Sequence, residues 1–556
     1  MTKETTCLFL ILLGLGVSCS KKEAPGPAVV TPPASFSVNS IRVDGKFDGF
    51  TYYETRVNPE LRLNFSAKLT VASIEKAITW RSKEGQNVAF TAALRDGDST
   101  VVLTPTSPLQ YLAQYTVTVP TSLEAGNGGK LQSGFALQLF TAVDSKDKFP
   151  RISDEDLLTL VQRQTFAYFW DFAHPVSGLA RERNTSGDIV TTGGSGFGIM
   201  AIPVAIERGF ITRSEGFERT QKIVAFLKDK AVRYHGAYPH WLHGATGAVV
   251  PFSQKDNGAD LVETSFLMQG LLTVRQYFSG AGEAENRLRA DINAIWNGVE
   301  WSWFQKNNEN VLYWHWSPEF NWEMNLPIRG WNESLVTYVL AASSTTHAIN
   351  KSVYTQGWTR NGGFTNGKEF YGHQLPLGED LGGPLFFSHY SFLGINPKGL
   401  TDGFTNYQTQ NRNHSLINHA YCKANPKNYR GYSDSCWGLT ACDIPGGYTA
   451  SSPTNDRGVI TPTAALSSIP YTPEESLKAL HYFYYKLGDK LWGKYGFYDA
   501  FSLQELWFAD SYLAIDQGPI ILMIENYRTG LPRKLFMSAP EVRNGLQKLG
   551  FSSPDL

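Results

Sequence analysis

The stretch from about residue 150 to the C-terminus most constrains the fold, because helical spacing of apolar residues recurs along it and the alternation of strands does not. Helices are predicted at 217–230, 260–278, 284–304, 332–347, 474–487 and 517–527. Long loops rich in Gly, Asn, Pro and aromatic residues separate them, and loops of such length in a compact domain are usually functional. We therefore expect a mainly α protein with an α/α toroid over residues 150–556, its functional site at the loop-bearing end.

Composition limits the partners of such a chain. It has 50 Lys and Arg against 51 Asp and Glu, so its net charge of −1 excludes a general nucleic-acid binder. Charged residues make up 18% and aromatic residues 13%. A chain of this kind can build large cores and also stacking surfaces for neutral ligands. An enzyme acting on neutral polar substrates and a binding protein for them are the two leading classes.

The N-terminus carries a targeting signal. The apolar run Cys7–Val17 is too short to span a bilayer, which takes about 20 residues, and has the proportions of a signal peptide, predicted over 1–18. It ends in Leu15-Gly-Val-Ser-Cys19, which resembles a lipoprotein signal with Cys19 as the lipid anchor. An ordinary secretory signal is the alternative. The Pro-rich segment 19–35 is then a tether, and we expect a lipoprotein of the cell envelope, held at the outer membrane.

Residues 36–142 have the pattern of an all-β domain. Leu61-Arg-Leu-Asn-Phe65 and Tyr115-Thr-Val-Thr-Val119 alternate, and Arg95-Asp-Gly-Asp98 and Gly126-Asn-Gly-Gly129 indicate turns. Repeated short strands favour a sandwich, and the segment resembles bacterial Ig-like domains. The sequence shows no acid pair or metal cluster there, so a spacer is expected; accessory glycan binding is the alternative.

Three acids share one short segment, Asp256-Asn-Gly-Ala-Asp260-Leu-Val-Glu263. Spacings of four and three residues would put them on one helical face. Acids gathered in this way repel each other, which raises at least one pKa. A catalytic or sugar-binding cluster is one interpretation, and an N-terminal capping cluster that uses the helix dipole is the other.

A further acid follows a Trp-rich loop in Gly330-Trp-Asn-Glu333-Ser. Trp314, Trp316 and Trp331 fit no helical stripe, and aromatic faces stack on the apolar faces of sugar rings; packing on the scaffold is the alternative. A flanking Trp could raise the pKa of Glu333, as a general acid requires, while a helix N-terminus would lower it. Asp516, before an apolar helix, is either catalytic or an N-cap.

Other motifs carry weaker signals. The histidines lack a metal pattern such as H-E-x-x-H. The Gly-rich segment Gly193-Gly-Ser-Gly-Phe-Gly198 lacks the Lys of a phosphate-binding loop. We therefore expect no metal and no cofactor. Of Cys422, Cys436 and Cys442, two could pair in an exported chain.

Several segments together resemble one family. They are Thr191-Thr-Gly-Gly-Ser-Gly-Phe-Gly198, Ile206-Glu-Arg-Gly-Phe-Ile211, Gly236-Ala-Tyr-Pro-His-Trp241, Gly330-Trp-Asn-Glu-Ser334 and Asp516-Gln-Gly-Pro519. They resemble the glucoamylase-like family of bacterial (α/α)6-barrel proteins, glycoside hydrolase family 144, whose characterised members cleave β-1,2-glucans. The resemblance implies an inverting hydrolase without a metal, acting at the cell envelope on β-1,2-linked glucan or its oligosaccharides.

The resemblance also implies roles for single residues. Glu333 matches the general acid, Asp516 the general base, and Asp260 and Glu263 acids that position the sugar. The expected substrate-binding residues are Asp256, Arg183, Tyr238, Trp241, Trp314, His315, Trp316 and Trp331. A monomer is expected. The alternatives are a hydrolase of another linkage, such as α-1,4, and a non-catalytic glycan-binding lipoprotein, because fold likeness does not fix a substrate.

Overall fold

The structure is a computed structural model that describes residues 34–556. The predicted signal peptide, Cys19 and most of the 19–35 tether lie outside the described residues. The chain divides after Thr141 into two compact units, which are described separately.

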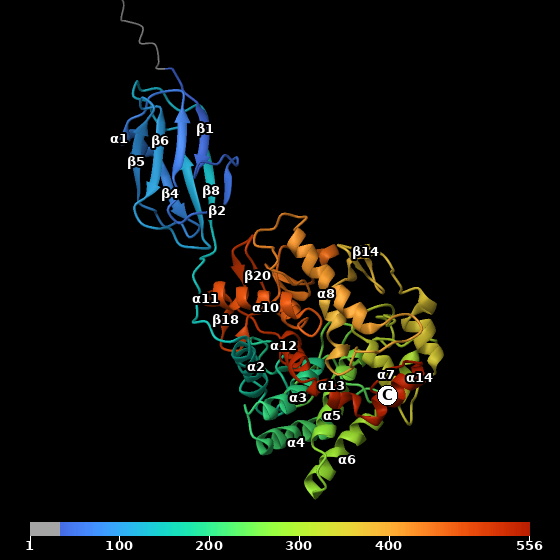
Figure 1. Ribbon diagram of the computed structural model, residues 1–556. Coiled ribbons are helices and arrows are strands. Elements are labelled where there is room, and N and C mark those ends of the chain that lie inside the picture. Colours follow the sequence, from blue (N-terminus) through green and yellow to red (C-terminus); the bar gives the residue numbers. More distant parts are fainter. Residues whose placement is uncertain (1–33) are drawn as a thin grey trace, which may run out of the picture. The chain divides into compact units, whose positions relative to one another are not determined.

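The N-terminal unit is a β-sandwich (Figure 1). One sheet has the order β1 (Val38–Val43), β3 (Leu61–Phe65), β6 (Thr100–Pro105) and β5 (Phe90–Arg95). The other has the order β2 (Thr51–Thr55), β8 (Phe135–Thr141), β7 (Gln114–Val119) and β4 (Thr79–Ser82), and α1 (Val71–Ala77) lies between β3 and β4 in sequence. Leu61, Leu63 and Phe65 alternate into a core of their own. This confirms the predicted sandwich.

The C-terminal unit is built from two layers of helices (Figure 1). Four helices are buried on nearly all sides: α3 (Thr192–Glu207), α5 (Leu261–Tyr277), α7 (Leu335–Ser343) and α12 (Ala514–Arg528). Helices buried in this way form the inside of a protein. Others bury one face: α2 (Asp154–Trp170), α4 (Arg213–Asp229), α6 (Glu283–Asn297), α8 (Tyr407–Ala424), α10 (Pro473–His481) and α14 (Pro540–Leu549). This is the layering of a helical toroid.

Short elements complete the unit. The remaining α-helices are α9 (Pro462–Leu466), α11 (Gly488–Leu491) and α13 (Leu531–Met537). One three-stranded sheet lies in the loops, made of β9 (Ile189–Thr191), β10 (Trp241–His243) and β11 (Val249–Val250). The other short strands form pairs: β12 (Ala259–Asp260) and β13 (His315–Trp316); β14 (Glu369–Phe370) and β15 (His373–Gln374); β16 (Ala441–Ile444) and β17 (Gly447–Ala450); β18 (Trp492–Gly493) and β19 (Gly496–Phe497); β20 (Phe501–Ser502) and β21 (Trp507–Phe508). The predicted helix 284–304 was too long, because α6 ends at Asn297, before Gly298.

Glycines let α3 and α5 approach each other closely. The Gly-rich segment 193–198 forms the first turns of α3 rather than a loop. A Cβ added at Gly196 would overlap the backbone of Phe266, and one at Gly270 would overlap the backbone of Gly196. The absence of side chains at these two positions therefore sets the contact between two inner helices.

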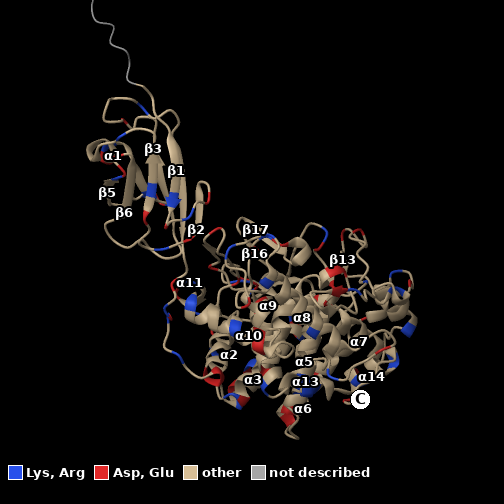
Figure 2. Cartoon of the chain, turned by 45° about the horizontal axis from the view of Figure 1, so that its top comes forward, with Lys and Arg blue, Asp and Glu red and all other residues tan. Residues whose placement is uncertain are grey.

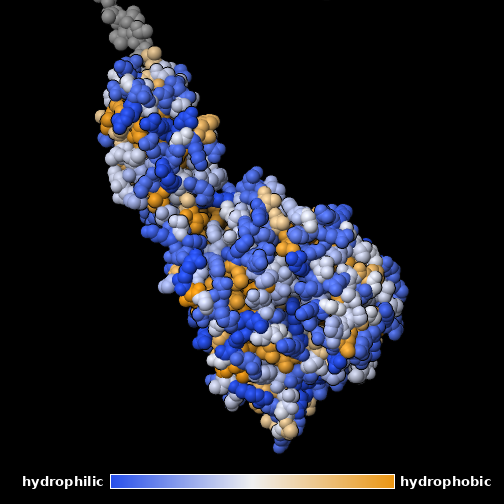
Figure 3. Space-filling model, in the orientation of Figure 1, coloured by the Kyte–Doolittle hydropathy of each residue, from blue (hydrophilic) through white to orange (hydrophobic). Residues whose placement is uncertain are grey.

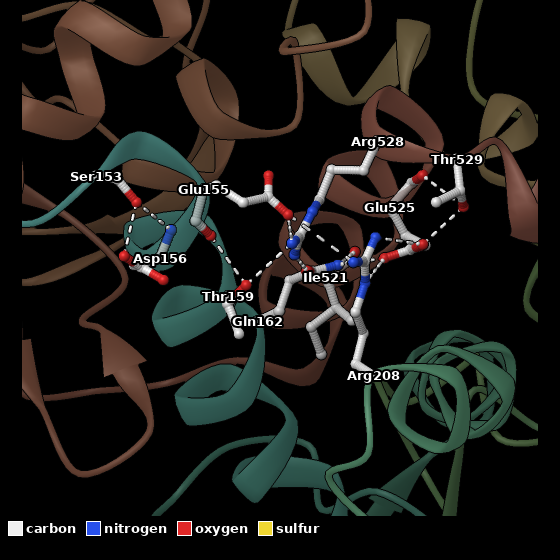
Figure 4. Close-up of polar contacts among 10 residues, drawn as sticks. All are labelled: Ser153, Glu155, Asp156, Thr159, Gln162, Arg208, Ile521, Glu525, Arg528 and Thr529. Carbon is white, nitrogen blue, oxygen red and sulfur yellow. Dashed lines mark hydrogen bonds and ion pairs between the residues drawn. The ribbon is translucent and has the colours of Figure 1, made fainter.

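A buried polar cluster joins α12 to its neighbours (Figure 4). Arg208, which follows α3, makes two hydrogen bonds of 2.8 Å to Glu525, a residue only 1% exposed. Gln162 of α2 donates to the Ile521 carbonyl at 3.1 Å and accepts from Arg528 at 2.6 Å. Paired charges and satisfied amides of this kind are what burial of polar groups requires.

The surface carries mixed charge. Figure 2 shows basic and acidic residues interleaved over the helices, as the net charge of −1 suggests. On the face in Figure 3, hydrophobic residues form small separate patches. Within residues 34–556, none of the helices combines the length and the apolarity that crossing a membrane would need.

Candidate active site

The start of α5 organises a group of acids. Asp260 is the N-cap of this helix and accepts a hydrogen bond from the Glu263 backbone N–H at 2.9 Å. The Glu263 carboxylate accepts the N–H of Gly193 at 2.7 Å, so the glycine-rich start of α3 holds it. The capping alternative is therefore confirmed for Asp260, which also belongs to a buried acid cluster; the catalytic or sugar-binding role stays a prediction.

Asp256 reaches the same cluster by another route than predicted. The shared helical face was wrong, because α5 begins at Leu261 and Asp256 lies in the loop before β12. The pairing of Asp260 with His315 in β12 and β13 brings the loop back. His315 Nε2 then lies 3.3 Å from Asp256 and 3.5 Å from Asp260. Loop folding, not helical spacing, gathers these acids.

Two histidines balance the charge of the cluster. His240 Nδ1 lies 2.9 Å from Asp260 Oδ2. Burial opposes protonation of His240, but Glu263 and Asp260 outweigh it and raise its pKa to about 9. Burial likewise acts to raise the pKa of Asp260, but hydrogen bonds from His240 and His315 hold it well below its usual range. Asp260 is thus a carboxylate paired with a protonated imidazole.

The other two acids of the cluster hold their protons more tightly. Burial, helped by the charge of Asp260, raises the pKa of Asp256 to about 6. Burial also raises the pKa of Glu263, to about 7, with His240 opposing the shift. One cluster therefore contains a carboxylate and two carboxyls that titrate near neutrality, which is the kind of contrast that acid–base sites show.

His240, Asp256 and Asp260 also bring ligand atoms within 4.8 Å of one another. A cation there would need the free lone pair of a neutral imidazole. The pKa of about 9 keeps His240 protonated at neutral pH, with Asp260 as its partner. The donor set fits an ion-pair network better than a metal.

Glu333 lies two residues before α7, on the segment after Trp331. Its side chain is 9% exposed, and its carbonyl accepts a hydrogen bond from the Ser391 hydroxyl. Burial raises its pKa to about 8, with smaller contributions from Glu263 and Asp260. Desolvation therefore dominates at this carboxyl, which stays protonated at neutral pH.

Two hollows meet at Glu333. One, of about 390 Å³, is lined by Glu263, His240, Trp241, Phe252 and other residues. The second, of about 570 Å³, extends along Trp331, Arg329, Arg360 and Phe387. Trp314 and Glu333 line both. A protonated carboxyl thus lies where two adjoining spaces join, beside an aromatic ring.

Asp516 lies in the first turn of α12 and is 2% exposed. Its Oδ2 is buried without a hydrogen-bond donor among the described residues. Tyr390 lines the first hollow, and after burial the charges of Asp516, Glu333 and Glu263 raise its pKa. The three acids therefore lie near enough to one tyrosine to act on its pKa, although they come from three inner helices or their ends.

The predicted sugar-binding residues take different positions. Arg183, Trp241 and Trp314 line the first hollow, and Trp331 lines the second. Arg183 is already engaged by Glu182 and Asp443. His315 contacts Asp256 and Asp260 of the acid cluster. Tyr238 belongs to the packed interior, where it is fully buried and donates to the Leu227 carbonyl. Trp316 is partly buried, packs edge-on against Trp303 and lines neither of these two hollows.

Several lining residues were not predicted. They are Glu182, Phe252, Phe386, Tyr390 and Tyr448. Phe252 packs on His240 with ring centroids 4.3 Å apart. Four of them lie in the long aromatic loops, which does not single them out, and Glu182 is marked in the sequence only by its neighbour Arg183.

A third hollow, of about 680 Å³, lies by the turn between α12 and α13. Its charged lining is mostly basic, with Lys398, Arg528, Arg533, Lys534 and Arg543. Asp555 is the single acid among the described residues that line it. Hydrolysis of a glycoside uses two carboxyls, so this hollow is a poor candidate. The three cysteines of the unit are buried free thiols.

The solved relatives are (α/α)6 glucanases, and the two-layered helical toroid of this chain matches their fold. Residues 325–540 match the family described as putative glucoamylase, and residues 51–142 match the bacterial Ig-like domain. The chain belongs to this glucoamylase family, with an Ig-like domain before it. The resemblance seen in the sequence and the predicted fold class are thereby confirmed.

Three relatives carry the assignment. A putative glucoamylase from Bacteroides uniformis is 58% identical, with a TM-score of 0.72, covering 73% of this chain and 100% of that one. An endo-β-1,2-glucanase from Chitinophaga pinensis, solved with sophorotriose and glucose, is 55% identical, with a TM-score of 0.71 and coverage of 73% and 100%. An exo β-1,2-glucooligosaccharide sophorohydrolase from Parabacteroides distasonis is 47% identical over 421 residues, 72% of this chain. The match spans 58% of that relative's length.

Proposed function

We propose that the protein is an inverting glycoside hydrolase that cleaves β-1,2-linked glucan or its oligosaccharides. The observation that carries the proposal is Glu333, a buried carboxyl whose pKa is raised to about 8, placed where two sugar-sized hollows join. Relatives that are 55% and 47% identical are a β-1,2-glucanase and a β-1,2-glucooligosaccharide hydrolase, which supports the linkage.

In this proposal Glu333 is the general acid and Asp516 the general base. Glu333 protonates the bridging oxygen of the glycosidic bond, while Asp516 takes a proton from the attacking water, directly or through a substrate hydroxyl. Glu263 positions the sugar in the first hollow, and Asp260, buried outside its lining, holds His240, which lines it. Support comes from Tyr390, which is close enough to Glu333 and Asp516 for both charges to raise its pKa.

Space on both sides of Glu333 favours cleavage inside a chain. The two hollows have volumes of about 390 Å³ and 570 Å³, and both are lined by rings on which sugars can stack, such as Trp241 and Trp331. A site closed on one side of the acid would favour release of units from a chain end. The endo-acting relative is the more similar of the two named β-1,2 hydrolases.

The test is to incubate the purified protein with β-1,2-glucan, amylose and laminarin and to size the products over time. We expect cleavage of β-1,2-glucan alone, with early products of mixed length. The first products should carry the α-anomeric configuration in NMR spectra, since inversion of a β-linkage yields it. Cleavage of amylose would favour the α-1,4 alternative. Tight binding of a glucan without any product would favour the glycan-binding lipoprotein.

We also propose that Cys19 anchors the protein by a lipid at the cell envelope. The short apolar run before Cys19 supports this. Cys19→Ala should move the protein from the membrane to the soluble fraction after ultracentrifugation. A variant that remains wholly in the membrane fraction would contradict the anchor.

A further inference from the structure

Asp516 has a second buried carboxyl beside it, that of Asp499, in the turn between β19 and β20. Asp499 is 3% exposed, and the two carboxyls lie close enough for each to act on the pKa of the other. Asp499 Oδ1 and Asp516 Oδ2 are both buried, and neither receives an N–H or O–H from the rest of the described protein. Two ionised carboxylates cannot remain in such contact. A proton shared between the carboxyls supplies the donor that these oxygens lack.

A chain of contacts fixes the far side of Asp499. Its Oδ2 accepts the backbone N–H of Asp443 at 2.7 Å. The Asp443 carboxylate is in turn held by Arg183 at 3.2 Å and by the Ser511 hydroxyl at 2.6 Å. Asp443 lies on β16, directly opposite Tyr448 of β17, which lines the first hollow. The hairpin that contributes to the hollow therefore also orients Asp499.

We propose that Asp499 is a positioning residue that shares one proton with Asp516 and thereby sets the orientation and charge of the general base. This inference rests on the proposed hydrolase function. Before reaction the pair carries one proton and one negative charge. Asp516 can then accept a proton while Asp499 keeps it aligned, which an isolated buried aspartate could not do without its own donor.

The reaction balances with this pair. The oxygen of water bonds to the anomeric carbon, and the bond from that carbon to the bridging oxygen breaks. Glu333 gives its proton to the bridging oxygen, and the proton from water goes to Asp516, directly or through a substrate hydroxyl. The pair then holds two protons. After the products leave, it loses one proton to solvent and Glu333 regains one.

Several groups face the pair and act on its titration. Burial comes first and raises both pKa values. The charge of Asp443 adds to this rise, and Arg183 opposes it. Tyr448, Cys442 and Tyr390 lie close enough for Asp516 to raise their own pKa values. The charge of Asp499 raises the pKa of Asp516, as the charge of Asp443 does. Removing either charge should therefore move the titration of Asp516 to lower pH.

The experiment compares kcat/KM against pH for wild type, Asp499→Ala, Asp499→Asn and Asp443→Asn. Asp499→Ala removes the carboxyl that holds Asp516 in place, so kcat should fall by roughly 10²-fold, the lower range for general catalysis, with KM little changed. It also removes the charge that raises the pKa of Asp516, so the acidic limb should move to lower pH. Asp499→Asn keeps a donor and should recover most of that loss. Asp443→Asn removes a negative charge and should move the acidic limb to lower pH. Asp456→Asn, at another buried aspartate 4% exposed, should leave the limb in place.

A measurement without substrate separates this inference from the proposed hydrolase function. In protein labelled with 13C at the aspartate carboxyls, the Asp516 resonance, assigned with Asp516→Asn, should titrate in two steps in wild type and in one step in Asp499→Asn. A two-step titration in a protein that cleaves no glucan would support the Asp499–Asp516 pair and contradict the proposed hydrolase function. A folded Asp499→Ala with an unmoved acidic limb, or a single-step wild-type titration, would overturn the pairing.

Discussion

At the scale of the residue, burial decides the chemistry of Glu333. Its position near the N-terminus of α7 would lower its pKa, yet desolvation raises it to about 8. Glu333→Gln keeps the shape and removes the proton donor. We expect kcat to fall by roughly 10²–10⁴-fold with substrate binding little changed. Steady-state kinetics together with isothermal titration of an oligosaccharide measure both. A near-normal kcat would contradict the assignment of Glu333 as the general acid and would make Glu263 the next candidate.

The same pKa predicts a pH effect on stability. In the folded protein the pKa of Glu333 is about 8, against an ordinary value of 4.5. Between these two pH values Glu333 is protonated in the folded state and ionised in the unfolded state. Its contribution to stability is therefore lost as pH rises from about 4.5 to 8. Glu333→Gln should raise the melting temperature relative to wild type more at pH 9 than at pH 5. Equal differences at both pH values would contradict the buried, raised pKa.

The sequence predicted that three acids lie close together, but not how they meet. Asp256, Asp260 and Glu263 do form one cluster, but Asp256 joins it through β12 and β13, a pairing between loops that local periodicity cannot show. Tyr238 was expected to bind sugar, and the structure packs it in the interior. Trp316, also expected there, is partly buried against Trp303 and lines neither hollow. An aromatic residue in a motif has the same local pattern whether it faces a ligand or a core.

At the scale of the element, helices were predicted well and their ends less so. α4, α5 and α12 lie within a few residues of their predicted spans, because apolar spacing marks them. α6 ends early because Gly298 follows it, and the next turn is a 3-10 helix over Trp301–Gln305. Caps and short turns depend on contacts that spacing alone does not contain.

The ion pair between Arg208 and Glu525 should matter for the stability of α12. Arg208→Ala leaves the carboxylate of Glu525, 1% exposed, without its cation, so we expect a loss of about 3–5 kcal/mol in the free energy of unfolding. Chemical denaturation measures it. Arg287→Ala is the matched control, since Arg287 pairs with Glu283 at side-chain exposures of 73% and 90%, and should cost at most about 1 kcal/mol. Equal losses for both would show that burial of the pair is not what matters.

At the scale of the whole molecule, each unit has its own hydrophobic core. The acids and the aromatic lining of both hollows all come from the helical unit. Removing residues 34–141 should therefore leave kcat on soluble oligosaccharides within about threefold, because a domain with its own core can fold alone. Kinetics on sophorotriose-sized substrates, with circular dichroism as a folding control, test this. A folded truncation that loses most of its activity would assign the sandwich a part in catalysis.

The close contact of α3 with α5 also bears on how such a protein can change. Gly196 and Gly270 leave no room for even one methyl group, and Gly193 holds Glu263 by its backbone. Variation at these positions would disturb the floor of the cleft before it altered any preference for a sugar. The surrounding loops, which supply Phe252, Tyr448 and Arg360, are under no such restriction. Divergence in substrate length or branching should therefore accumulate in the loops, and mutant libraries that seek new specificity should be built there.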